Sequence, residues 1–228
     1  MPSALTPPNT RSIQFDVADC TLREQSEEHL GWSTSNDVFL VLRVPKARAD
    51  WQFDLQDLSA ARNYFSSKCA DNGGVLLEIE KVVVHGRHAL LGLFKYRSPI
   101  PQSLGMMFSN VLWIPYGDWL LEISVESPER GDTGLREAVV LAMGKNNEST
   151  AEQATPIVLD NTEDMFATMR ARPLQALPSD DRRFDDMFPE HPLSKVRHRM
   201  RQLISTVSIA EEVTAPGLPK RAPWWKFW

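Results

Sequence analysis

Cysteine is scarce in this 228-residue sequence, and a long hydrophobic run is absent. The two cysteines, Cys20 and Cys69, form no CxxC pair, which excludes a disulfide mini-protein, a zinc knuckle and a redox dithiol. Pro115 and Asp118 interrupt the densest apolar region, which falls far short of the ~20 residues that span a bilayer. The first ten residues also lack the basic start and apolar stretch of a secretory signal. We therefore expect reduced thiols and a cytoplasmic protein.

Positive charge is scarce outside the carboxyl end. Residues 1–192 carry 18 basic and 28 acidic side chains (18 − 28 = −10), whereas residues 193–228 carry 7 and 2 (7 − 2 = +5). An acidic body repels phosphate backbones, so we predict no nucleic-acid partner. Hydrophobic content of 42% and charged content of 24% are ordinary for globular proteins and predict one domain with tails.

The usual catalytic signatures are missing as well. The sequence contains no GxSxG, HExxH, GxGxxG or GxxxxGK[ST] motif, which favours a non-enzymatic protein. For the alternative, a hydrolase-like enzyme of unknown substrate, the candidate residues are Glu78, Glu80 and His85. Glu78 and Glu80 are two apart in a predicted strand and share a face, as paired carboxylates would. Their alternation with Leu77 and Ile79 favours a solvated face instead.

A second pattern, His85-Gly86-Arg87-His88, has two histidines three residues apart. In a hairpin tip this spacing does not place both rings on one side, and no Cys, Asp or Glu ligand is close in sequence. We interpret these histidines as turn residues, and we predict no metal site and no cofactor.

Apolar periodicity predicts the elements of an α+β domain over residues 12–144. Strands are expected at 12–17 and 38–44, and a helix with Asp54 as N-cap over 54–65. Two hairpins follow, one turning at His85-Gly86 and the other at Tyr116-Gly117. Another helix is expected over 134–143, with Gly144 as its end. Together these predict a mainly antiparallel sheet flanked by helices.

The remaining chain divides into a lead-in and three later segments. Residues 1–11 are predicted to be a mobile lead-in, and residues 145–192 an acidic irregular excursion with a short helix near 162–170. Phe184, Met187 and Phe188 are candidates to hold this excursion on the body. Residues 193–210 have the clearest amphipathic pattern and predict a C-terminal helix with its apolar residues on one face. Its polar face is expected to carry Lys195, Arg197, Arg199 and Arg201.

Residues 211–228 form a proline-containing basic aromatic tail, with three of the seven tryptophans in the last five residues. Large apolar rings favour burial, by on the order of 2 kcal/mol each. Three alternatives stay open: the tail packs on its own domain, binds a protein partner or a second copy, or lies on a membrane surface. The candidate partner-binding residues are Trp224, Trp225, Lys226, Phe227 and Trp228.

One stretch of the sequence resembles a known group. It runs from Trp51 through Tyr64-Phe65, Gly73-Gly74, the alternating residues 77–80 and the turn 84–89 to Trp119-Leu120-Leu121-Glu122-Ile123. This pattern is similar to the Mog/PsbP/DcrB-like group over about residues 12–143. The resemblance implies an antiparallel sheet sandwiched by helices, and no shared catalytic motif. It further implies a protein-binding factor, such as an adaptor, chaperone or immunity-type protein of a bacterial secretion or toxin system.

Overall fold

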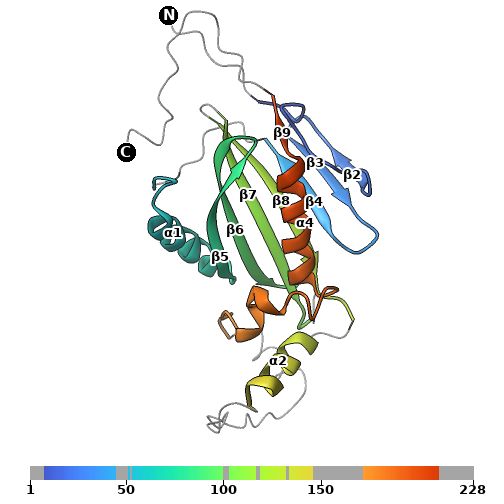
Figure 1. Cartoon of the computed structure of the whole chain (residues 1–228), viewed down its shortest axis with the longest axis vertical. Coiled ribbons are helices and arrows are strands. Elements are labelled where there is room, and N and C mark those ends of the chain that lie inside the picture. The colour runs from blue at the N-terminus through green and yellow to red at the C-terminus, as the bar shows by residue number, and fades with distance from the viewer. Residues whose placement is uncertain are drawn as a thin grey trace, which may run out of the picture.

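The computed structural model describes residues 8–44, 51, 53–99, 103–116, 119–131, 134–145 and 172–210. Its centre is a seven-stranded sheet in the order β2-β3-β4-β8-β7-β6-β5, and every neighbouring pair is antiparallel. Helices lie on both faces of this sheet (Figure 1). The predicted α+β class with a mainly antiparallel sheet is therefore confirmed.

Two long hairpins form the middle and one edge of the sheet. Strand β5 (Val75–Val84) pairs with β6 (Arg87–Arg97), and β7 (Met106–Tyr116) pairs with β8 (Trp119–Pro128). His85 and Gly86 both have positive φ, 47° and 74°, as a two-residue type I′ turn requires. In the second hairpin Tyr116 pairs with Trp119. Both predicted hairpins are confirmed.

Three shorter strands extend the sheet on the other side of β8. They are β2 (Thr21–Gln25), β3 (His29–Ser33) and β4 (Phe39–Arg43). The predicted strand at 38–44 corresponds to β4, whereas β2 and β3 were not predicted. The strand expected at 12–17 is only β1 (Ile13–Gln14), which pairs with β9 (Ser208–Ile209) in a separate two-stranded sheet.

Helix α1 (Leu58–Asp71) covers one face of the sheet. It begins at Asp57, which accepts a hydrogen bond from the Ala60 amide, and not at Asp54 as the sequence pattern indicated. The core on this face is aromatic: the rings of Phe65 and Trp113 stack with centroids 4.5 Å apart. A Cβ at Gly92 would lie 2.9 Å from both the Phe94 and the Trp113 rings, so this position on β6 requires glycine.

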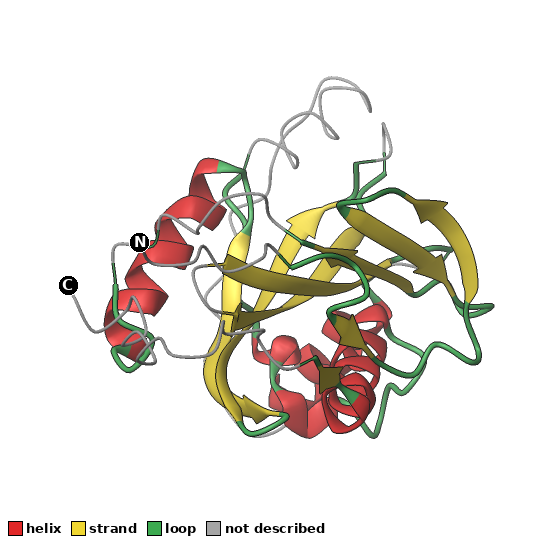
Figure 2. Ribbon diagram, turned by 90° about the horizontal axis from the view of Figure 1, so that it is seen from above, coloured by secondary structure: helices red, strands yellow, loops and turns green. Residues whose placement is uncertain are grey.

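Helix α4 (Pro192–Thr206) crosses the opposite face and confirms the predicted C-terminal amphipathic helix (Figures 1 and 2). Its buried apolar side chains pack over β4 and β6 to β8 in the second core cluster. They are Leu193, Val196, Met200 and Leu203. Each of these four side chains is at most 2% exposed, so this contact is a main source of hydrophobic stability.

Helix α2 (Leu135–Lys145) lies beyond one end of the sheet (Figure 1). Gly144 lies within this helix and does not end it, which corrects the sequence prediction. The segment that follows in the described chain forms two short 3-10 helices, η1 (Pro178–Asp180) and η2 (Arg182–Phe184), and η1 packs against α2. Phe184 is buried as expected, whereas Met187 is 51% exposed and does not hold the segment.

Three sequence predictions fall outside the described residues: the start of the lead-in, the short helix near 162–170, and the aromatic tail. Within the residues that are described, no helix is both long and apolar enough to cross a membrane.

Candidate functional site

Glu78 and Glu80 lie on the α4 face of the sheet. A bulge at β5 between Leu76 and Glu78 sets this register, because after it Glu78 pairs with Leu93 and shares its face. Glu78 binds two arginines: its Oε2 accepts from Arg182 Nη2 at 2.7 Å and its Oε1 from Arg197 Nη2 at 2.7 Å. Its side chain is only 25% exposed, so the expected solvated face is wrong for Glu78.

Glu80 is held less firmly than Glu78. Among the described residues its nearest basic atom is Arg182 Nη2 at 3.8 Å, and its side chain is 43% exposed. The hydrogen bond from Arg182 to Glu78 and the charge of that carboxylate raise the pKa of Arg182.

His85 lies at the far hairpin tip, seven residues from Glu78 along β5. At ~3.3 Å per residue it is therefore roughly 23 Å away. The three candidate catalytic residues thus form no common site.

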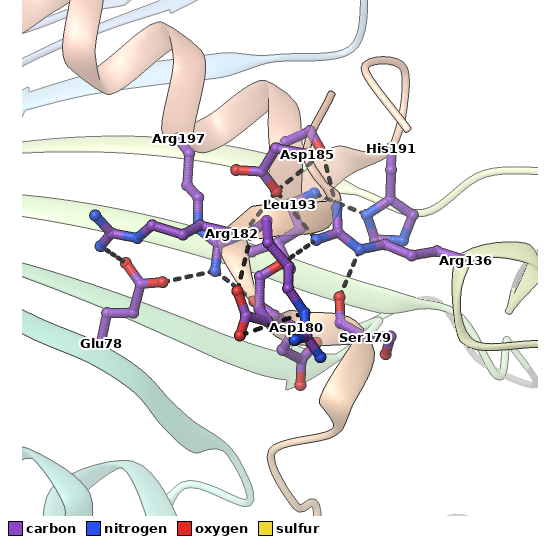
Figure 3. Close-up of polar contacts among 12 residues, drawn as sticks. Glu78, Arg136, Ser179, Asp180, Arg182, Asp185, His191, Leu193 and Arg197 are labelled. Carbon is purple, nitrogen blue, oxygen red and sulfur yellow. Dashed lines mark hydrogen bonds and ion pairs between the residues drawn. The ribbon is translucent and has the colours of Figure 1, made fainter. Parts of the chain in front are cut away.

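Arg197 connects β5 to the 3-10 segment (Figure 3). Besides Glu78, it donates to Asp185 Oδ1 at 2.8 Å and to the Asp180 carbonyl at 2.6 Å. The side chain is 5% exposed, so its assignment to the polar face of the helix is wrong. Ser194, one turn earlier on α4, also donates to Asp185, at 3.3 Å.

Arg136 makes a similar set of contacts from α2. It donates to the carbonyl oxygens of Ser179 at 2.6 Å and Asp181 at 3.0 Å, to Ser194 Oγ at 2.7 Å and to Asp185 at 3.0 Å. Asp185 therefore lies between two buried arginines. A buried charge left without a partner is costly, so this arrangement fixes α2, the 3-10 segment and the start of α4 together.

Lys95 and Asp180 form a third buried ion pair. Lys95 Nζ lies 3.0 and 3.1 Å from the two Asp180 oxygens, and the side chains are 2% and 6% exposed. The Leu177 amide also donates to Asp180, at 2.7 Å. This pair attaches η1 to β6, the strand beside the edge strand β5, so the whole network serves first to position a segment that has little apolar surface of its own.

A small hollow of about 50 Å³ lies beside this network, between α4 and the sheet. We call it the α4 hollow. Its buried lining includes Leu93, Asn110, Arg197 and Met200, and its exposed lining includes Arg201. Asn110 is 4% exposed, yet its Oδ1 accepts no hydrogen bond from any described residue. The Arg197 Nε likewise has no partner within the described part of the chain.

A second cluster joins the residue that follows β8, helix α2 and the N-cap of α4. Glu129, Glu137 and His191 bring ligand-type atoms within 4.8 Å of one another. His191 Nδ1 accepts from the Leu193 amide at 3.2 Å, so the ring proton of the neutral imidazole is on Nε2, which faces Glu129 Oε1 at 3.2 Å. A metal bound at Nε2 would displace that proton to Nδ1. Nδ1 could then no longer accept the hydrogen bond from the Leu193 amide, and the helix cap would be lost. The cluster therefore acts as a helix cap and not as a ready metal centre. The sequence did not reveal it, because its members are far apart in the chain.

Helix α2 has an inverted distribution of side chains. Arg136 and Val140, one turn apart, face the body and are 1% and 6% exposed. The opposite face carries Leu135 and Leu141, which are 63% and 61% exposed, together with exposed Ala138 and Ala142. Helices at a protein surface usually bury the apolar face and expose the charged one. We call this outward surface the α2 apolar face.

The predicted partner-binding residues of the tail, Trp224 to Trp228, lie outside the described chain.

Comparison with known proteins gives only distant matches to solved structures. No protein-family model matches this sequence, and no curated protein matches it. Among solved structures, the Ran-binding protein Mog1p of Saccharomyces cerevisiae is 10% identical with a TM-score of 0.45, over 91% of this chain and 97% of Mog1p. LpqN of Mycobacterium tuberculosis, a protein involved in cell envelope biogenesis, is 15% identical with a TM-score of 0.29, over 59% and 78%. A variant of protein Mog1 is 13% identical with a TM-score of 0.35, over 64% and 85%.

Proposed function

We propose that this protein acts by binding another protein and that the α2 apolar face is its docking surface. The observation that carries the proposal is the inversion of α2, whose leucines point outward while its arginine is buried. Large exposed apolar side chains gather in this region: Leu135, Leu141 and Met143 are on α2, and Leu177 precedes η1, which packs against it. Contiguous apolar patches mark interaction sites, and these residues are the candidates for one here.

The partner that fits best is a protein segment with an apolar face and basic margins. The chain has a net charge of −5, so a basic partner is attracted and an acidic one is repelled. A second copy of this chain is a poorer fit, because an 11-residue helix is about 16 Å long and two such helices bury less than the ~1,200 Å² of a stable interface.

A photo-crosslinking amino acid placed at Ala138, in the centre of the α2 apolar face, tests this proposal in cells. We expect crosslinks to a distinct protein, and we expect Leu141→Glu to abolish them because a charge would enter the interface. Leu22→Glu is the matched control, since Leu22 is 46% exposed on β2 and should leave the crosslinks unchanged. A crosslinker at Ala70, exposed on α1, should give none of them.

Three other outcomes contradict the proposal. Crosslinks within the same chain to residues 211–228 would mean that the aromatic tail covers the α2 apolar face. Crosslinks only between two copies, with a dimer by light scattering that Leu141→Glu dissociates, would mean self-association. Crosslinks that persist equally in the Leu141→Glu variant would mean that the captured protein does not use this face.

We propose separately that the tail is a second contact for the same partner, and deletion of residues 224–228 tests it. Partner contact predicts an unchanged melting temperature with weaker association. A lower melting temperature would instead support packing on the domain, and loss of vesicle co-sedimentation alone would support a membrane surface. The finer assignments, an adaptor, chaperone or immunity-type role in a bacterial secretion or toxin system, stay proposals that the identity of the crosslinked protein would test.

A further inference from the structure

The α4 hollow has the features of a binding site that is independent of the docking function proposed for α2. It is lined by residues of three strands and two helical segments, and two of these residues, Asn110 and Arg197, each have a buried polar atom without a partner among the described residues. Asn110 Oδ1 is an acceptor that needs a donor, and Arg197 Nε is a donor that needs an acceptor. An unpaired buried polar group costs about 1–3 kcal/mol, so two of them lining one hollow require an explanation.

The electrostatics of the lining favour an uncharged occupant. Three arginines, Arg182, Arg197 and Arg201, are matched by three carboxylates, Glu78, Glu80 and Asp185, so the formal charge of the lining is zero. Arg197 and Arg182 already bind Glu78 at 2.7 Å, and their remaining charge is largely neutralised. An anion would be repelled by Glu78 and Glu80, and a cation by the arginines, so neither is favoured.

Volume restricts the occupant further. About 50 Å³ is a third of the ~150 Å³ cavity that holds a benzene ring, so only a few heavy atoms fit. The apolar side chains of Leu91, Leu93 and Met200 complete the lining and favour a group with a short apolar stem. A primary carboxamide offers both complementary groups: a carbonyl oxygen that could accept from Arg197 Nε and an NH₂ group that could donate to Asn110 Oδ1.

We propose that the α4 hollow binds a carboxamide group, either of a free amide or of a glutamine or asparagine side chain. Bound there, the amide satisfies both orphaned atoms and contacts the residues that hold the 3-10 segment to the sheet. Occupancy is therefore coupled to the position of that segment, because Arg197 bonds to the occupant, to Asp185 and to the Asp180 carbonyl together.

Nuclear magnetic resonance titration of the isotope-labelled full chain tests the proposal with three small molecules of equal size. Acetamide both donates and accepts, acetone only accepts, and acetate is an anion. We expect acetamide to give saturable shifts at the Asn110 side chain and Arg197 Nε–H with roughly millimolar affinity, since so few heavy atoms provide little binding energy. Acetone and acetate should bind at least tenfold more weakly.

Variants and larger ligands sharpen the result. Asn110→Leu removes the acceptor at similar volume and should weaken acetamide binding at least tenfold, whereas Asn63→Leu, exposed on α1, should leave it unchanged. Free glutamine and glutamine blocked at both backbone ends then identify the source, because a preference for the blocked form indicates a protein side chain.

Two results would overturn the proposal. One is acetamide shifts that are absent or no larger than those of acetone, which would mean that ordinary water satisfies both atoms. The other is an Asn110→Leu variant that melts higher than wild type while acetamide shifts are unchanged, because the oxygen would then be only a destabilising defect. The wild-type titration decides the matter even if the variant folds poorly.

Discussion

Helices α4 and α2 place their charged and apolar residues in opposite ways. Helix α4 buries an apolar stripe against the sheet and includes Arg197 within it, whereas α2 buries Arg136 and exposes Leu135 and Leu141. The stability of α4 on the body is therefore mainly hydrophobic, and that of α2 depends on hydrogen bonds to one guanidinium. This contrast shows that burial identifies the structural face of a helix, and it is the basis for proposing the exposed apolar face of α2 as a docking surface.

Among the substitutions that test this contrast, Arg136→Ala should lower the free energy of unfolding most. The variant loses the four hydrogen bonds of Arg136 and leaves Asp185 with only one buried arginine. Because loss of one partner of a buried ion pair costs about 3–5 kcal/mol, we expect a drop of that size in the free energy of unfolding. Urea denaturation monitored by circular dichroism measures it.

Arg130→Ala is the matched control for that experiment. Arg130 is 56% exposed and its Nε lies 3.4 Å from Asp37, so its loss should change stability by no more than ~1 kcal/mol. Equal effects of the two substitutions would show that Arg136 does not hold α2 on the body.

A pair of leucine substitutions compares the two helices directly. Leu203 on α4 is 2% exposed, so Leu203→Ala should cost roughly 2–4 kcal/mol through lost burial and a cavity. Leu141 on α2 is 61% exposed, so Leu141→Ala should cost less than ~0.5 kcal/mol. Thermal and urea unfolding measure both. A large cost at Leu141 would mean that other parts of the same chain cover the α2 apolar face.

Glu78→Gln sharpens the comparison at the contact between α4 and β5. The substitution removes the charge that Arg182 and Arg197 share, and we expect a loss of about 1–3 kcal/mol, typical of hydrogen bonds to charged groups. Glu80→Gln should stay within ~0.5 kcal/mol, because its nearest arginine atom is 3.8 Å away and the site is partly exposed. If both substitutions changed the free energy of unfolding by equally small amounts, both carboxylates would behave as solvated side chains, as the sequence predicted.

Sequence patterns predicted the hairpins, the strand at 38–44 and α4, because each has strong apolar periodicity or a glycine turn. They missed β2, whose five residues are all exposed, since a strand without a buried face leaves no alternation to detect. Asp57 was missed as the N-cap because Asp54 fits the pattern equally well and only the first hydrogen bond distinguishes them.

The charged network was harder to foresee than the elements that carry it. Glu78, Arg136, Asp185 and Arg197 are separated by 12 to 119 residues, so no local spacing relates them. One signal was present in α4: Arg197 lies four residues after Leu193 and three before Met200, within the apolar stripe of the helix. The same four-residue spacing links Arg136 to Val140, so a charge in register with apolar residues indicates a buried ion pair.

The smallest expected effect concerns pH and lies on the α1 face, where the described residues form no comparable charge network. Burial raises the pKa of the Cys69 thiol above its ordinary value of 9.0, and burial with a hydrogen bond to Cys69 raises the pKa of Tyr96. Above about pH 9 the unfolded chain therefore releases a thiol proton that the folded chain retains. The contribution to stability is complete below this pH and is lost as pH rises, so the free energy of unfolding should fall between pH 9 and 10. Cys69→Ala should make that fall shallower without removing it, since the partly buried Tyr96 remains. An unchanged slope in urea denaturation across this range would show that the α1 core does not hold the thiol in its neutral form.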